Sequence, residues 1–137
     1  MRILLTNDDG IDARGICILE EVLSESHEVC VVAPCANRSG SSSSISMYSD
    51  QKLVKKSEKK FSLDGSPVDC VISALRGGYI PFVPEVVISG INNGANLGTD
   101  IIYSGTCGAA RQASLYGVPG LALSIDFSYG ECSFTGS

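Results

Sequence analysis

Two adjacent aspartates, Asp8 and Asp9, follow the apolar run Arg2–Thr6 and precede Gly10. Neighbouring carboxylates repel each other when both are ionised, and a hard divalent cation is the usual group that holds such a pair together. An ordinary turn closed by aspartate side chains is the alternative interpretation of the same residues. The aspartate pair alone leaves both interpretations open. The metal interpretation requires further metal ligands from other parts of the chain.

Further oxygen-bearing side chains stand directly after two other apolar runs. Ser39 follows the run Val29–Ala33, and Asn92 follows the run Val86–Ile88. Serine hydroxyls and asparagine carbonyls suit Mg²⁺, Mn²⁺ or Ca²⁺ better than zinc. Taken singly, the serine-rich segment Ser39–Ser46 also fits a flexible linker, and the loop around Asn92 also fits a wide turn.

The segment Ser104-Gly105-Thr106 opens a stretch with the composition of a helix rich in small residues. The N-terminus of a helix presents free N–H groups and a partial positive charge, which favours the binding of a phosphate. The simpler interpretation is that Ser104 or Thr106 caps the helix, and capping is compatible with phosphate binding. Neither a Walker A pattern nor a G-x-G-x-x-G pattern is present in the sequence.

Apolar runs of strand length alternate along the chain with segments of helical spacing. The expected strands are Arg2–Thr6, Val29–Ala33, Val86–Ile88 and Leu121–Ile125, and the expected helices are Gly15–Ser26, a helix that begins at Ser66-Pro67 and ends at Gly77-Gly78, and Gly105–Tyr116. This order predicts an α/β fold with a buried, mainly parallel sheet. The loops that follow parallel strands share one edge of the sheet, where ligands bind. The expected fold therefore brings the three polar loops together and favours the metal interpretation.

A small β-hairpin excursion is expected at about residues 47–65. It contains five of the ten basic residues, namely Lys52, Lys55, Lys56, Lys59 and Lys60. A solvated hairpin is one interpretation of these lysines, and attraction of an anionic ligand is the other.

Length and charge narrow the class of protein. The 137 residues fit one α/β domain over 1–137, and the net charge of −5 argues against a partner such as a nucleic-acid duplex. Because the sequence lacks a long apolar run or a secretory signal, we expect a soluble cytoplasmic protein with no membrane partner. The six cysteines lack CxxC spacing and are expected to be free core residues. The residues alone thus favour metal-assisted hydrolysis of a phosphoester.

Three segments carry a specific resemblance to a known family. The sequences MRILLTNDDG (Met1–Gly10), NRSG (Asn37–Gly40) and SGINNGANLGTDIIYSGTCGA (Ser89–Ala109) resemble the SurE, or survival protein E, family of metal-dependent nucleotidases. The resemblance implies a Rossmann-like, three-layer α/β/α fold and the hydrolysis of nucleoside 5′- and 3′-monophosphates with Mg²⁺ or Mn²⁺. It also implies a homodimer or a higher homo-oligomer.

The resemblance also assigns roles to residues by position. Those that match the metal ligands are Asp8, Asp9, Ser39 and Asn92, and those that match the phosphate pocket are Gly40, Ser41, Ser43, Asn96, Ser104, Gly105 and Thr106. Asp8 and Asp9 are the catalytic candidates, since one of them is a possible general base, although the sequence does not say which.

Members of this family continue beyond the point where this chain stops, so we expect a chain that lacks the family's C-terminal part. The alternative function is then a non-catalytic domain that binds a metal or a nucleotide. A second rival is a phosphatase that uses Asp8 as a nucleophile, but that class has a D-x-D pattern rather than the D-D pattern present here.

Overall fold

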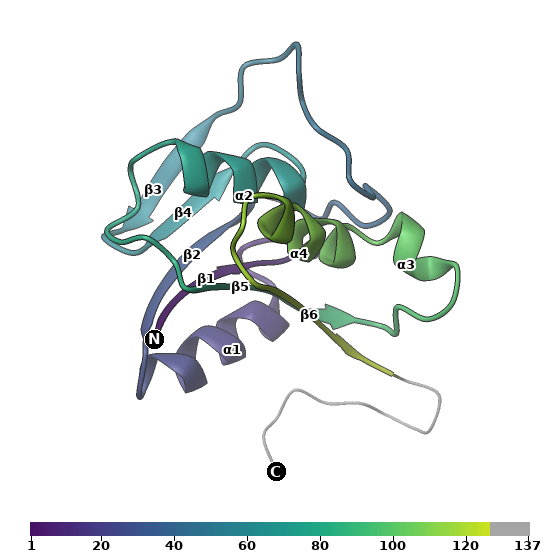
Figure 1. Ribbon diagram of the computed structural model, residues 1–137, viewed down its shortest axis with the longest axis horizontal. Helices are drawn as coiled ribbons and strands as arrows, with labels where there is room; N and C mark the ends of the chain where they lie inside the picture. The colour runs from purple at the N-terminus through teal and green to yellow at the C-terminus, as the bar shows by residue number, and fades with distance from the viewer. Residues whose placement is uncertain (127–137) are drawn as a thin grey trace.

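The computed structural model describes residues 1–126, which form a six-stranded sheet covered by helices on both faces (Figure 1). The strands are β1 (Arg2–Thr6), β2 (Glu28–Pro34), β3 (Leu53–Ser57), β4 (Lys60–Leu63), β5 (Val86–Asn93) and β6 (Gly120–Ile125), and the helices are α1 (Arg14–Ser24), α2 (Pro67–Arg76), α3 (Asp100–Tyr103) and α4 (Gly105–Leu115). The strand order is β3-β4-β2-β1-β5-β6, and every neighbouring pair is parallel except β3 and β4.

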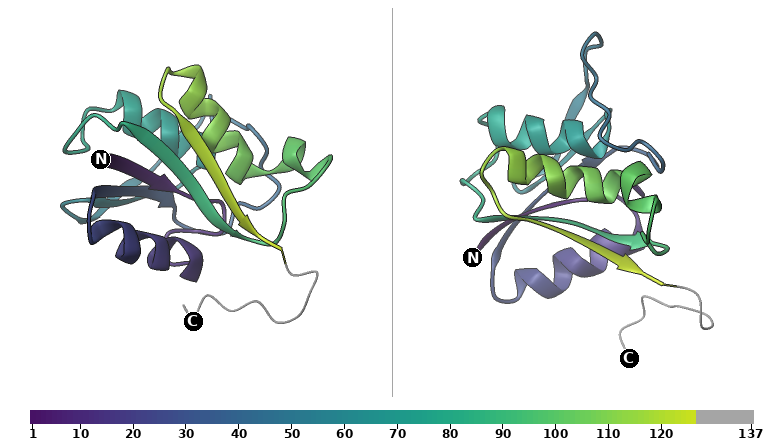
Figure 2. Two further views of the ribbon diagram at one scale, coloured as in Figure 1. Left: turned by 60° about the horizontal axis from the view of Figure 1, so that its bottom comes forward. Right: turned by 45° about the vertical axis from the view of Figure 1, so that its right-hand side comes forward.

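Alternation along the central strands divides the apolar residues between two cores, because successive side chains of a strand point to opposite faces. Leu4 of β1 and Val32 of β2 belong to the core that also holds residues of α2 and α4. Ile3 and Leu5 of β1 belong to the core under α1. Figure 2 shows α1 on one side of the sheet and α2 and α4 on the other. The expected α/β three-layer fold is confirmed.

The hairpin is part of the main sheet rather than an excursion from it. Strand β4 pairs in parallel with β2, and Phe61 and Leu63 of β4 are buried in the core on the α2 side. Apolar residues at alternate positions explain why β4 is drawn into the sheet, whereas β3 stays largely exposed at its edge.

Three of the hairpin lysines form ion pairs with glutamates, as the solvated interpretation expects. Their side-chain nitrogens lie 2.9, 3.7 and 2.7 Å from carboxylate oxygens in the pairs Lys55–Glu58, Lys59–Glu28 and Lys60–Glu20. No lysine of the hairpin lines the pocket described below. The hairpin therefore gives no support to the alternative of an anionic ligand.

Two elements differ from the sequence prediction. Strand β5 continues beyond Ile88 to Asn93, since β6 offers pairing partners to Asn92 and Asn93 after a shift in register. Helix α3 was not expected from the sequence, because its four residues bury no side chain and its N-cap residue makes no side-chain hydrogen bond. Both differences lie next to the loop that carries Asn92.

The cysteines in the described part are free, as expected, but not all of them are core residues, since Cys35 is exposed and Cys17 and Cys107 are partly buried. Cys30 and Cys70 are buried in the core, and burial raises the pKa of Cys30 to about 11 and also raises that of Cys70. Both thiols therefore stay neutral and pack as small apolar side chains. Cys132 lies outside the described residues. Among those residues, no helix has the length and apolar character that crossing a membrane requires.

Asp69 ties the serine-rich segment to the start of α2. Its carboxylate accepts hydrogen bonds from the Ser66 amide at 2.8 Å and from the Ser46 amide and hydroxyl at 2.9 and 2.8 Å. The Asp69 amide in turn donates to the Ser66 hydroxyl, which completes the capping box expected from the sequence. Burial alone would raise the pKa of Asp69, but the hydrogen bonds from Ser46 and Ser66 together lower it.

The substitution Asp69→Asn is expected to reduce the free energy of unfolding by about 1–3 kcal/mol at pH 7, because an amide cannot accept all of these bonds. A lowered carboxyl pKa stabilises the fold above the unfolded pKa near 3.8, and this stabilisation is lost as the pH falls through the folded pKa. Urea unfolding at pH 7 and pH 3 measures both effects, and the difference from the unsubstituted chain should shrink at pH 3. Asp50→Asn, at an exposed position, is the matched control. An equal loss for the two variants at pH 7 would contradict this role of Asp69.

Candidate functional site

The polar loops meet at the carboxyl-terminal edge of the sheet, beside α3 and the start of α4 (Figure 1). They enclose an open pocket of about 300 Å³. Six of the residues predicted from the sequence line it, namely Asp8, Ser39, Gly40, Asn92, Asn96 and Ser104. They come from the ends of β1, β2 and β5 and from the residue before α4, as the parallel topology requires.

The turn after β1 is closed by Asn7, so neither aspartate is used to form it. The Asn7 side chain donates to the Gly10 carbonyl at 2.7 Å and accepts from the Gly10 amide at 3.2 Å. The simpler interpretation expected a turn closed by an aspartate side chain. A turn of this kind is present, but the Asn7 side chain closes it. Neither carboxylate is therefore used by the turn, but only Asp8 lines the pocket, and Asp9 lies outside its lining.

Backbone amides join the loops to the two aspartates. The Arg38 amide donates to the Asp8 carbonyl at 2.6 Å, which fixes the loop after β2 against the loop after β1. The Asn93 amide donates to Asp9 Oδ2 at 3.1 Å, which fixes the end of β5 on the other side. These two contacts hold the three loops together around the adjacent carboxylates.

Asp8 is the most unusual charged group in this pocket. It is only 4% exposed, and its Oδ1 atom is buried without a hydrogen-bond partner among the described residues. Burial raises the pKa of its carboxyl and the neighbouring Asp9 charge raises it further, while the nearby hydroxyl and amide of Thr106 partly offset both effects. An ionised carboxylate in this position needs a cation to compensate it.

Other buried polar atoms without a well-formed hydrogen bond lie around the same strand ends. The hydroxyls concerned belong to Thr6, Ser41, Ser89 and Thr106, and outside this region the described residues include only one further such atom, on Gln51. Thr6 and Ser89 face each other across the β1–β5 pairing. Unpaired buried polar groups are rare in folded proteins and mark places where a ligand or an ion completes the bonding.

Ser39 and Asn92 present neutral oxygen atoms to the same pocket. The Asn92 amide nitrogen donates to the Gly94 carbonyl at 2.8 Å, which leaves its Oδ1 atom without a donor among residues 1–126. The Ser39 amide donates to the Asn37 side chain at 2.8 Å, and the Ser39 hydroxyl has no protein partner in that range. The two oxygens are thus available to a hard cation.

The start of α4 packs directly against Asp8. Ser104 caps the helix by accepting a hydrogen bond from the Cys107 amide at 3.1 Å, as the capping interpretation expects. Gly105 and Thr106 are buried in the first turn. A Cβ atom on Gly105 would lie 2.7 Å from Ser41 Oγ and 3.2 Å from Asp8 Cβ, so a glycine is needed for this close approach. The helix N-terminus therefore lies beside the carboxylates.

Two of the predicted phosphate-binding residues have protein partners instead. The Ser43 hydroxyl accepts from Arg111 at 2.8 Å, and Ser43 does not line the pocket. The amide nitrogen of Asn96 donates to the Ser124 hydroxyl at 2.6 Å, so it is directed at β6 although Asn96 does line the pocket. Ser41 lies next to Gly105 and lines a neighbouring hollow instead of this pocket.

Five further pocket residues were not among the predicted site residues, namely Asn93, Gly94, Ala95, Asp100 and Tyr103. The first three belong to the polar loop that drew attention to Asn92, so their place in that loop was an available signal. Asp100 and Tyr103 belong to α3, whose short and exposed sequence has no recognisable helix pattern.

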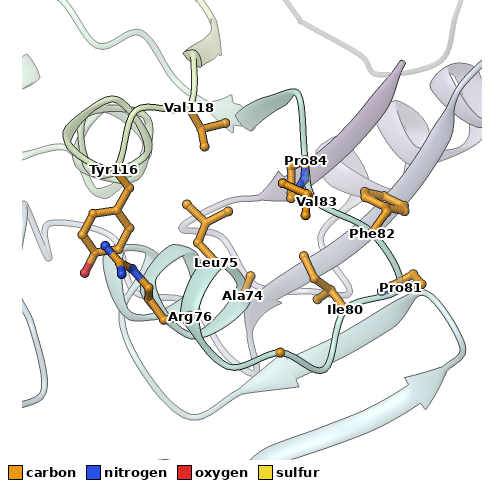
Figure 3. A pocket seen from close by; sticks show the side chains of 11 residues that line it. Ala74, Leu75, Arg76, Ile80, Pro81, Phe82, Val83, Pro84, Tyr116 and Val118 are labelled. Carbon is orange, nitrogen blue, oxygen red and sulfur yellow. The ribbon is translucent and has the colours of Figure 1, made fainter.

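A larger pocket of about 580 Å³ lies between the ends of α2 and α4 and the segment before β5, at the opposite edge of the sheet (Figure 3). Its walls include Leu75, Ile80, Phe82 and Val118, and its one charged residue is Arg76, which lies over the Tyr116 ring at 4.4 Å. Because no carboxylate or histidine lines it and its one hydroxyl belongs to Tyr116, we assign the candidate site to the smaller polar pocket.

Comparisons with known proteins identify relatives that match nearly the whole chain. A family model described as Survival protein SurE matches residues 3–136. The chain is 44% identical over 128 residues to the 5′-nucleotidase SurE 1 of Burkholderia lata, covering 93% of this chain and 49% of that protein. It is 48% identical over 141 residues to the 5′-nucleotidase SurE of Treponema pallidum, covering 98% and 75%.

A solved structure has the same fold. The crystal structure of the SurE protein from Aquifex aeolicus matches with a TM-score of 0.89 and 38% identity, over 98% of this chain and 54% of that one. The chain thus spans about half the length of the Burkholderia and Aquifex proteins. The match of the family model over nearly the whole sequence shows that the chain belongs to the SurE family.

Proposed function

We propose that the polar pocket hydrolyses nucleoside monophosphates, as a 5′/3′-nucleotidase that depends on a divalent metal. The observation that carries this proposal is the buried, unpaired Asp8 carboxylate beside Asp9 and the N-terminus of α4. The relatives named 5′-nucleotidase support the substrate class. That activity belongs to the full-length relatives, so for this chain it is part of the proposal.

The residues present fit a hard metal ion such as Mg²⁺ or Mn²⁺. Asp8 would contribute an oxygen that lacks a partner within residues 1–126, and Ser39 and Asn92 would contribute neutral oxygens. Asp9, which follows Asp8 and lies outside the pocket lining, would contribute a second carboxylate. No cluster of three histidine, cysteine or acidic side chains exists within residues 1–126, so this mixed set of oxygens is the one that fits. When bound, the ion would supply Lewis-acid activation of a water molecule and of a phosphoryl oxygen.

The start of α4 would hold the phosphoryl group of the substrate. Its first amides and the Ser104 hydroxyl present donors and a partial positive charge beside the acidic pair. These donors would stabilise the negative charge that develops on the phosphoryl oxygens as a water attacks the phosphorus atom in line with the leaving ribose oxygen. Asp8 or Asp9 would accept the proton of the attacking water.

A non-catalytic domain that binds a metal or a nucleotide is the second candidate, because the same pocket residues could hold either ligand without turnover. Cytoplasmic location and assembly into a homodimer or higher homo-oligomer stay predictions from the sequence. So does the assignment of the whole chain to one domain.

We expect the purified chain to release phosphate from AMP with Mn²⁺ or Mg²⁺ and to lose this activity in EDTA. Asp9→Ala should reduce kcat/KM by at least about 100-fold, because it removes one of the two carboxylates from the metal site. A colorimetric phosphate assay measures both. Asp12→Ala, at an exposed position three residues away, is the control and should keep the activity. Tight binding of AMP without release by a folded chain would favour the non-catalytic domain instead.

We also expect Asp8→Asn to raise the melting temperature in EDTA, because the amide removes a buried charge that repels Asp9. Addition of Mn²⁺ should raise the melting temperature of the unsubstituted chain, since a ligand that binds only the folded state stabilises it. The same addition should leave the Asp8→Asn variant nearly unchanged. Calorimetry with and without Mn²⁺ measures these shifts, and Asp12→Asn is the control. An equal gain from Mn²⁺ in the Asp8→Asn variant would exclude Asp8 as a ligand.

A further inference from the structure

Tyr103 presents an aromatic ring to an otherwise polar pocket. The residue lines the pocket together with Asp8, Ser104 and Asn92, and 64% of its surface is exposed. It is the one aromatic residue in the pocket lining that the structure describes. The ring is thus accessible from solvent beside the carboxylate and amide groups of the pocket.

The backbone around this ring is held in place from both sides. The Ser42 amide donates to the Tyr103 carbonyl at 3.0 Å, and the Ser42 hydroxyl donates to the Ile102 carbonyl at 2.7 Å. The residue after Tyr103 is Ser104, which caps α4. These bonds fix the backbone that carries the Tyr103 ring one residue before the proposed phosphate-binding N-terminus.

We propose that the Tyr103 ring stacks on the nucleobase of a nucleotide whose phosphate lies at the start of α4. This proposal rests on the proposed function and adds the residue that distinguishes nucleotides from smaller phosphate esters. Every nucleobase has a flat π face, so stacking on an aromatic ring adds affinity with little preference for one base. The remaining pocket residues are polar or small and offer no comparable surface.

A neighbouring hollow provides the competing position for the nucleoside. It lies on the other side of the serine-rich segment, has a volume of about 340 Å³ and is lined by Arg38, Asp50, Asp64 and several serines. Arg38 is already paired with Asp64 at 2.6 Å. Because this hollow contains no aromatic or aliphatic side chain, it offers no stacking surface, and the observations favour the side of Tyr103.

Binding measurements separate recognition of the base from recognition of the phosphate. The probes are the 5′-phosphonates of adenosine and of ribose, in which a carbon atom replaces the ester oxygen so that neither is hydrolysed. Isothermal titration calorimetry in Mn²⁺ should show tighter binding of the adenosine compound. Tyr103→Ala should raise its Kd at least about five-fold, the effect of removing one stacked base, and should change the Kd of the ribose compound less than about two-fold. Tyr103→Phe should preserve both values.

The control is Tyr48→Ala, which removes a tyrosine that is 98% exposed and does not line the pocket. It should leave both Kd values unchanged. In the active chain, Tyr103→Ala should raise the KM for AMP with little change in kcat, because stacking contributes equally to the ground and transition states.

Three results would overturn the proposal. They are equal binding of the two phosphonates by the unsubstituted chain, equal weakening of both by Tyr103→Ala, and weakening of the adenosine compound by Ser49→Ala, in the neighbouring hollow, rather than by Tyr103→Ala. Failure of the proposed function looks different, because the adenosine compound would then still bind through Tyr103 while AMP releases no phosphate.

Discussion

The site is organised around one unfavourable placement, the Asp8 carboxylate at the end of a buried strand with a second carboxylate beside it. Such a group is destabilising in a medium of low dielectric unless a cation or several donors compensate it. Within residues 1–126, the nearby Thr106 supplies part of that compensation. The negative charge of the buried Asp8 carboxylate is therefore only partly compensated, and a bound divalent ion would compensate it further. This charge at the end of strand β1 is the link between the fold and the proposed chemistry.

The neighbouring loops approach the Asp8-Asp9 pair closely. The Arg38 amide reaches the Asp8 carbonyl, the Asn93 amide reaches Asp9, and Gly105 allows the first turn of α4 to lie against both Ser41 and Asp8. Backbone amides and a glycine make these contacts without bulky side chains. As a result, the side-chain oxygens of the loops remain free to face the pocket, which is what binding of a cation and a phosphate requires.

The sequence predicted a strand or a helix start correctly where its local residue pattern agrees with its burial in the fold. Continuous apolar runs placed β1 and β2 because both faces of these strands are covered, and the capping box placed the start of α2. It was less informative where long-range pairing decides the outcome. The extension of β5 depends on partners in β6, and the hydrogen bond from Arg111 to Ser43 depends on how α4 meets the serine-rich segment. Tyr103 was not among the predicted site residues for a related reason. Helix α3, to which it belongs, buries no residue and so has no apolar pattern in the sequence.

Several contacts that set the geometry of the pocket join elements within residues 1–126. The asparagine-closed turn at Asn7, the amides on Asp8 and Asp9, and the cap of α4 each join two described residues. The opposite edge of the sheet, where the strands begin, forms an apolar pocket instead. This contrast follows from the parallel topology, which brings the carboxyl ends of β1, β2 and β5 to the N-terminus of α4 and thus gathers carboxylates, amides and a helix dipole at one edge. The preorganisation of the proposed metal and phosphate positions is therefore a property of the topology, and the ring of Tyr103 extends it to the nucleoside.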